Sequence, residues 1–124
     1  MILTVNTSKP YRIFIERGCL SRAGEEAARI FSAKAKAVVV TDSNVGPIYA
    51  RRIAASFSAA GFQTSVFTFP AGEEHKRLSE ISEMSAAFSA RELTRSDFIV
   101  ALGGGVTGDL AGFAAATYLR GIRF

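Results

Sequence analysis

The sequence lacks several features that would indicate a particular environment or partner. It has one cysteine, Cys19, so no internal disulfide can form and a reducing cytoplasm is the expected location. Its N-terminus has neither the basic start nor the long apolar core of a signal peptide. The 15 lysines and arginines never form a run longer than two residues. Since nucleic-acid-binding proteins gather basic residues on one face or helix, we expect no nucleic-acid partner. The net charge of +4 suits a negatively charged small substrate.

One long segment has little charge: residues 98–119 contain Asp109 as their single charged residue. Such a length is sufficient to cross a bilayer. However, an aspartate near the middle of the span would cost roughly 2.5–3.5 kcal/mol. The glycines from Gly103 to Gly105 would also interrupt a continuous helix. Because the composition, with 48% hydrophobic and 21% charged residues, is typical of a globular domain, we expect no membrane partner.

The apolar residues alternate between strand-like and helix-like patterns, with no internal repeat. Strands are expected over residues 11–16, 36–42, 62–69 and 97–102. Helices are expected over residues 20–31, 47–60, 73–91 and 110–119. From Lys36 onward the order β-α-β-α-β-α predicts an α/β fold, a parallel sheet with helices on both faces and right-handed crossovers. Residues 121–124 look like the start of another strand, so we expect the chain to be the N-terminal part of a longer protein.

A glycine-rich segment follows the last expected strand and allows two interpretations. Gly103, Gly105 and Gly108 fit G-x-G-x-x-G between a strand and a helix, the context of a loop that binds a dinucleotide pyrophosphate. Alternatively, Gly104, Gly108 and Gly112 form a smooth helix face for close packing. Asp109 favours the first interpretation, since a carboxylate in an otherwise apolar helix needs a partner.

Three segments together resemble the 3-dehydroquinate synthase family. The most specific is "GGGVTGDLAGFAAATYLRG", residues 103–121, which carries the family's glycines, its Gly-Asp and Gly-Phe pairs, its tyrosine and its Arg-Gly pair. "TDSNV" (residues 41–45) is similar to the family's first strand-end loop. "PAGEEHK" (residues 70–76) is similar to its G-E-x-x-K segment. The resemblance extends over essentially the whole chain.

The resemblance implies a Rossmann-like NAD-binding domain of the dehydroquinate synthase-like fold. Residues 1–124 would form this incomplete N-terminal domain, without the helical metal-binding domain that follows it in the family. Arg120 would bind an anionic group of the substrate, across a dimer interface. The residues that would bind NAD are Asp42, Asn44, Val45, Gly72, Glu73, Lys76, Gly104, Gly105, Val106 and Asp109.

Simpler structural roles are open for several of these residues. Asp42 and Asn44 would contact the adenosine ribose, or else form a turn that caps a helix. Glu73 and Lys76 would reach the ribose and phosphates, or else lie in a solvated first helical turn. Arg120 would otherwise be a cation at the end of a helix.

The implied reaction converts 3-deoxy-D-arabino-heptulosonate 7-phosphate to 3-dehydroquinate and phosphate in the shikimate pathway. NAD takes a hydride and returns it, so it is not consumed. The family's divalent metal, zinc or cobalt, is held by a glutamate and two histidines. This chain has only His75, which we expect to be an exposed helix residue. We therefore expect the chain alone to be inactive, and the whole enzyme to be a homodimer.

Two alternatives stay open. One is another enzyme of the same fold, either a different sugar-phosphate cyclase or a metal-dependent polyol dehydrogenase. The sequence "LAGF" after Asp109 favours the cyclases, because the dehydrogenases tend to have alanine-lysine there. The other is a non-catalytic nucleotide-binding module.

Overall fold

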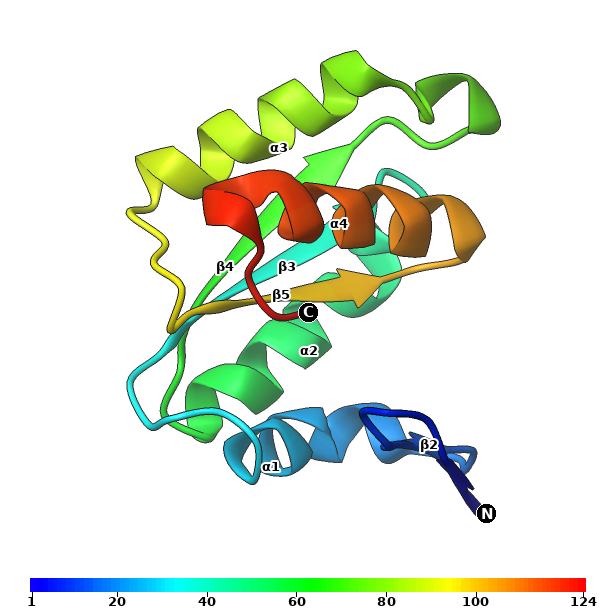
Figure 1. Cartoon of the computed structure of the whole chain (residues 1–124). Coiled ribbons are helices and arrows are strands. Elements are labelled where there is room, and N and C mark those ends of the chain that lie inside the picture. Colours follow the sequence, from blue (N-terminus) through cyan, green and yellow to red (C-terminus); the bar gives the residue numbers. More distant parts are fainter.

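A three-stranded parallel sheet forms the centre of the molecule in the computed structural model, which describes all 124 residues (Figure 1). The strands are β3 (Lys36–Asp42), β4 (Gln63–Phe69) and β5 (Phe98–Leu102), in the order β4-β3-β5. β3 is buried on both faces, as expected for a continuous run of alanine and valine between two parallel neighbours. The predicted parallel α/β sheet is therefore confirmed.

Helices cover both faces of this sheet and create two hydrophobic cores. α1 (Ala23–Ala28) and α2 (Gly46–Ala59) lie on one face, and α3 (Leu78–Ala90) and α4 (Gly105–Thr117) lie on the other (Figure 1). Successive side chains of β3 point to opposite faces of the sheet and so belong to different cores. Val38 and Val40 face α3 and α4, while Val39 faces α2.

An antiparallel hairpin precedes the sheet. β1 (Ile2–Val5) pairs with β2 (Tyr11–Phe14), and the two strands form a separate two-stranded sheet. The strand expected over residues 11–16 is thus present but shorter, and its partner β1 was not predicted. Between the hairpin and α1, a short 3₁₀ turn (Cys19–Arg22) occupies the start of the helix expected over residues 20–31.

The helix predicted over residues 73–91 is wrong in its first turn. Glu73–His75 form a separate 3₁₀ turn, and α3 begins only at Leu78. Between them, Lys76 (φ −76°, ψ 72°) is the centre of an inverse γ-turn, closed by the Arg77 N–H donating to the His75 carbonyl at 2.9 Å. Acidic residues favour the start of a helical turn, but they do not distinguish a 3₁₀ turn from an α-helix.

The last helix begins five residues earlier than predicted, at Gly105 in place of Leu110. Glycine has a low helix propensity, and this suggested a longer loop. In the structure, burial of Thr107 and Leu110 against the sheet fixes the first turn as helix, and Gly108 donates its N–H to the Gly104 carbonyl at 3.0 Å. After α4 and a 3₁₀ turn (Tyr118–Arg120), Arg123 forms a parallel bridge to Phe98, so the strand-like character of residues 121–124 is also confirmed.

No helix in the structure has both the length and the apolar character that a membrane crossing needs.

Candidate functional site

The carboxyl ends of the three parallel strands bring three loops to one edge of the sheet. These loops are residues 43–45 after β3, residues 70–77 after β4, and Gly103–Gly104 after β5. β3 and β5 are neighbours, yet β3 leads into α2 on one face and β5 leads into α4 on the other (Figure 1). Adjacent strands whose connections leave in opposite directions form the crevice in which open α/β sheets bind ligands.

Asp42 forms a turn just before α2, although no side chain caps the first residue of that helix. One carboxylate oxygen, Oδ1, accepts hydrogen bonds from the N–H groups of Asn44 and Val45, each at 2.8 Å. The other oxygen, Oδ2, accepts a longer hydrogen bond of 3.4 Å from the hydroxyl of Thr107 in the first turn of α4. Asp42 therefore links the two sides of the crevice. Asn44 itself is exposed, and Val45 is half-buried.

The glycines at the start of α4 have different roles. A Cβ at Gly103 would come within 2.4 Å of the Thr107 hydroxyl oxygen, so close packing requires glycine there. A Cβ at Gly104, Gly105 or Gly108 would meet no atom within 4 Å. The packing-face interpretation is therefore wrong for Gly104 and Gly108, and holds only at Gly112, where a Cβ would approach the Phe124 ring at 2.9 Å.

The open surface over Gly104 and Gly105 lies at the N-terminus of α4. The first N–H groups of a helix have no partner within the helix, and the helix dipole places partial positive charge there. The side chain of the next residue, Val106, is half-buried. With no side chain covering it, this backbone is accessible to an anionic group such as a pyrophosphate.

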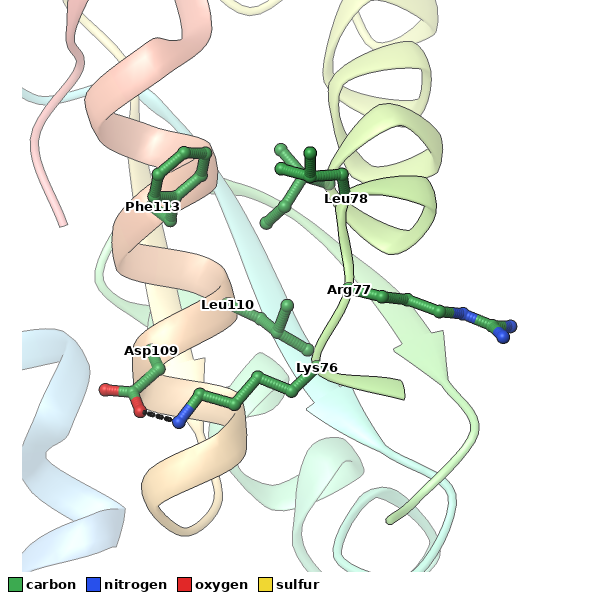
Figure 2. A pocket seen from close by; sticks show the side chains of 7 residues that line it. Lys76, Arg77, Leu78, Asp109, Leu110 and Phe113 are labelled. Atoms are coloured by element: carbon green, nitrogen blue, oxygen red, sulfur yellow. Dashed lines mark ion pairs between the residues drawn. The ribbon is translucent and has the colours of Figure 1, made fainter. Parts of the chain in front are cut away.

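Lys76 is the partner that Asp109 was expected to need. Its Nζ lies 2.6 Å from Asp109 Oδ2, which joins the loop after β4 to α4 (Figure 2). The hydrogen bond to Asp109 and the negative charge of its carboxylate raise the pKa of Lys76 above its ordinary value of 10.5. Glu73 adds a smaller contribution in the same direction. Two residues predicted to bind the same cofactor, 33 positions apart in the sequence, thus meet in space.

A groove extends from this ion pair between α3 and α4. It has a volume of about 270 Å³. Its outer wall carries the exposed side chains of Leu78 and Phe113, which face one another across the opening (Figure 2). The lining residues are Lys76, Arg77, Leu78, Ile81, Asp109, Leu110 and Phe113. The groove therefore combines an ion pair at one end with an apolar surface at the other.

A second hollow lies on the opposite side of the glycine segment. It has a volume of about 400 Å³ and is lined by Leu20, Val45, Tyr49, Leu102 and Gly103. Residues of the predicted site therefore border both hollows, with Lys76 and Asp109 in the first and Val45 in the second.

One expectation is wrong, one residue was missed, and one residue lies just after the last helix, where the sequence placed it. His75 is not an exposed helix residue: it lies in the 3₁₀ turn with its side chain 20% exposed, beside Glu80. Glu80 was missed, although an acid in the first turn of α3 is a recognisable signal. Arg120 lies just beyond the far end of α4, about 20 Å along the helix axis from the glycines by the usual rise per residue.

The remaining predicted residues lie near the groove. Gly72 has φ 126°, in the region that favours glycine, and a Cβ there would come within 2.4 Å of the Glu74 carboxylate. Glu73 is exposed at the start of the 3₁₀ turn. No group of three or more histidine, cysteine, aspartate or glutamate side chains lies together in a way that would hold a metal ion.

The fold is that of the dehydroquinate synthase-like sugar phosphate cyclases. The structure matches 2-deoxy-scyllo-inosose synthase complexed with carbaglucose-6-phosphate, NAD⁺ and Co²⁺ with a TM-score of 0.86 and 25% identity, over 98% of this chain and 33% of that one. Glycerol dehydrogenase from Schizosaccharomyces pombe matches with a TM-score of 0.59 and 25% identity, over 82% of this chain and 24% of that one.

Sequence comparison narrows this class to one family. Residues 66–124 match the family model described as 3-dehydroquinate synthase N-terminal. A 3-dehydroquinate synthase from Streptococcus pneumoniae is 50% identical over 115 residues, which cover 93% of this chain and 32% of that protein. The chain belongs to the 3-dehydroquinate synthase family, and it spans about a third of the length of the curated relatives it matches.

Proposed function

We propose that residues 1–124 form the NAD-binding domain of a 3-dehydroquinate synthase. The observation that carries this proposal is the uncovered backbone of Gly104 and Gly105 at the start of α4, beside the Lys76–Asp109 ion pair. The pyrophosphate of a dinucleotide binds at a helix N-terminus that small residues leave uncovered. A cation nearby attracts its negative charge. The related 2-deoxy-scyllo-inosose synthase, with the same fold, was solved with NAD⁺, which supports the assignment of this cofactor.

Each part of the site has a distinct task under this proposal. The N–H groups at the start of α4 hold the pyrophosphate, and Lys76 adds a positive charge at the edge of the groove. The loop of Asp42, Asn44 and Val45 receives the adenosine ribose. Because Asp42 Oδ1 already accepts two backbone hydrogen bonds, only Oδ2 has acceptor capacity left for a ribose hydroxyl. When bound, NAD supplies reversible hydride acceptance at a substrate carbinol.

The proposed reaction of the whole enzyme is the conversion of 3-deoxy-D-arabino-heptulosonate 7-phosphate to 3-dehydroquinate with elimination of phosphate, a carbon–oxygen lyase step in the cytoplasm. The relatives were solved with divalent ions, Co²⁺ in one case, but the residues of this chain do not fit such a site. No step is therefore assigned here to a metal, and we propose that the chain alone does not turn over substrate.

The function is tested with the full-length protein. Calorimetry should detect NAD binding, and Lys76→Met should weaken it, because the variant removes the charge while keeping an unbranched side chain of nearly the same length. Phosphate release from the heptulosonate phosphate should depend on added NAD. Phosphate release from a different sugar phosphate alone would assign another cyclase, and NAD reduction with glycerol would assign a polyol dehydrogenase. Failure to bind NAD would overturn the proposal.

We also propose that the enzyme is a homodimer. Leu3, Val5, Tyr11 and Ile13 share one face of the β1–β2 hairpin, and this face carries no charge. The opposite face turns toward α1, where Arg12 reaches Glu26 at 3.6 Å. A surface without charge can meet its own copy across a two-fold axis without repulsion. A second copy would also explain how Arg120, which is remote from the glycines of its own chain, contributes to a substrate site.

A further inference from the structure

Glu80 is a buried carboxylate that none of the predicted roles accounts for. Its side chain is 3% exposed, in the first turn of α3 directly behind the loop that carries Lys76. Oε1 has two partners, but Oε2 is buried without any hydrogen bond. A buried charge is costly unless it is paired, and an unpaired buried oxygen adds to that cost. The free-energy cost of burying this carboxylate must therefore be offset by a benefit to the structure or to the function.

Both partners of Glu80 come from the residues that flank Lys76. His75 Nδ1 lies 3.0 Å from Glu80 Oε1, and the Arg77 guanidinium donates to the same oxygen at 3.3 Å. One carboxylate oxygen thus holds the residue before Lys76 and the residue after it. Figure 2 shows that Arg77 points away from the Lys76–Asp109 ion pair. Its guanidinium donates instead to Glu80.

The backbone explains why this arrangement directs Lys76. Lys76 is the central residue of the inverse γ-turn, in which the Arg77 N–H donates to the His75 carbonyl at 2.9 Å. In such a tight turn the flanking residues approach each other while the central side chain points outward. Lys76 accordingly leaves the loop toward Asp109 on α4 (Figure 2). Glu80 closes the turn from behind, and Asp109 holds the exposed end of the side chain.

We propose that Glu80 is a positioning residue, which fixes the turn at Lys76 so that its ammonium group is held in place for the phosphates of the cofactor. This inference rests on the proposed NAD-binding function. Glu80 itself does not touch the cofactor, because its side chain is buried beneath the loop. Glu80 acts on NAD affinity only by holding Lys76 in position. Removing the Glu80 carboxylate therefore weakens NAD binding although no group that contacts NAD is lost.

The test is a double-mutant cycle measured on the full-length protein by NAD calorimetry. Glu80→Gln keeps the shape of the side chain and removes its charge, and should weaken NAD binding by about tenfold, the scale of one charge-assisted hydrogen bond. In a Lys76→Met background the same substitution should have almost no further effect, because the two residues act through one group. At saturating NAD the kcat of Glu80→Gln should stay near that of the parent protein while the KM for NAD rises.

The matched control is Glu83→Gln, which removes an exposed carboxylate one turn further along α3 and should leave NAD affinity unchanged. If Glu80→Gln does not fold, Arg77→Ala removes one partner from the exposed side of the loop and should weaken NAD binding in the same direction. Additive effects of Glu80→Gln and Lys76→Met would overturn the positioning role, as would normal NAD affinity in a folded Glu80→Gln protein. If the parent protein binds no NAD, the proposed function fails instead.

Discussion

Lys76 Nζ and Asp109 Oδ2 lie 2.6 Å apart and join the loop after β4 to the first turns of α4. Both side chains are largely exposed, so this ion pair contributes little to stability by itself. The location of the ion pair matters more, because the pair lies at the end of the groove nearest to the open backbone of the glycine segment. The pair holds the Lys76 ammonium group beside the glycine segment, where we propose that the pyrophosphate binds.

The ionisation of Lys76 provides the first prediction. Since the pKa of Lys76 in the folded protein is raised above 10.5, the ion pair contributes to stability below pH 10.5 and this contribution is lost as the pH rises through the raised pKa. Asp109→Asn should lower the pKa of Lys76, because it removes the carboxylate charge. NMR titration of the Lys76 side chain measures this directly. Glu83→Gln, a charge change remote from the pair, should leave the titration unchanged, and an unaltered midpoint in Asp109→Asn would contradict the prediction.

The glycine segment provides a prediction that separates stability from binding. Gly105→Ala should leave the stability equal or raise it by up to about 1 kcal/mol, because its Cβ meets open space and alanine favours a helix. The same methyl group should weaken NAD binding by covering the backbone. Gly103→Ala should instead destabilise the fold by about 1–3 kcal/mol, since its Cβ would clash with Thr107. Urea unfolding and calorimetry measure the two effects, and normal NAD affinity in Gly105→Ala would count against the pyrophosphate site.

A third prediction concerns Arg120. Leu119 (φ 49°) and Arg120 (φ 63°) both adopt left-handed backbone conformations, which are unfavourable for residues other than glycine. Arg120→Gly should therefore raise the free energy of unfolding by up to about 1 kcal/mol. If Arg120 binds substrate, the same variant should lose most of its activity in the full-length enzyme. Leu119→Gly is the control, with a similar gain in stability and retained activity. A destabilised Arg120→Gly protein would show that the backbone is not strained.

The hairpin provides a fourth prediction, on oligomeric state. Ile13→Lys places a charge on the apolar face and should shift a dimer toward monomer in sedimentation experiments over a range of concentrations. Thr4→Lys adds the same charge to the opposite face of the hairpin and should leave the dimer intact. If both variants dissociate to the same extent, or if both remain dimers, the dimer interface lies elsewhere on the molecule.

Much of the fold was predictable because local sequence and tertiary environment agree. The run Ala37–Val40 is buried on both faces of a parallel sheet, which is the environment that such a run favours. Pro47 near the start of α2 and Gly61 after its end mark that helix correctly. β1 was missed because a strand of four residues, three of them exposed, gains its stability only from pairing with β2, a contact that periodicity does not reveal.

The sequence by itself determined the order of the main elements from Lys36 onward, the sheet edge at which the loops gather, and the family, since each depends on local patterns or on a specific motif. Tertiary structure decided how those loops are used. Only the folded structure shows that Asp109 pairs with Lys76 and that the buried Glu80 bonds to both His75 and Arg77. The physical reason is that side-chain position depends on packing between elements, which spacing along one chain does not specify.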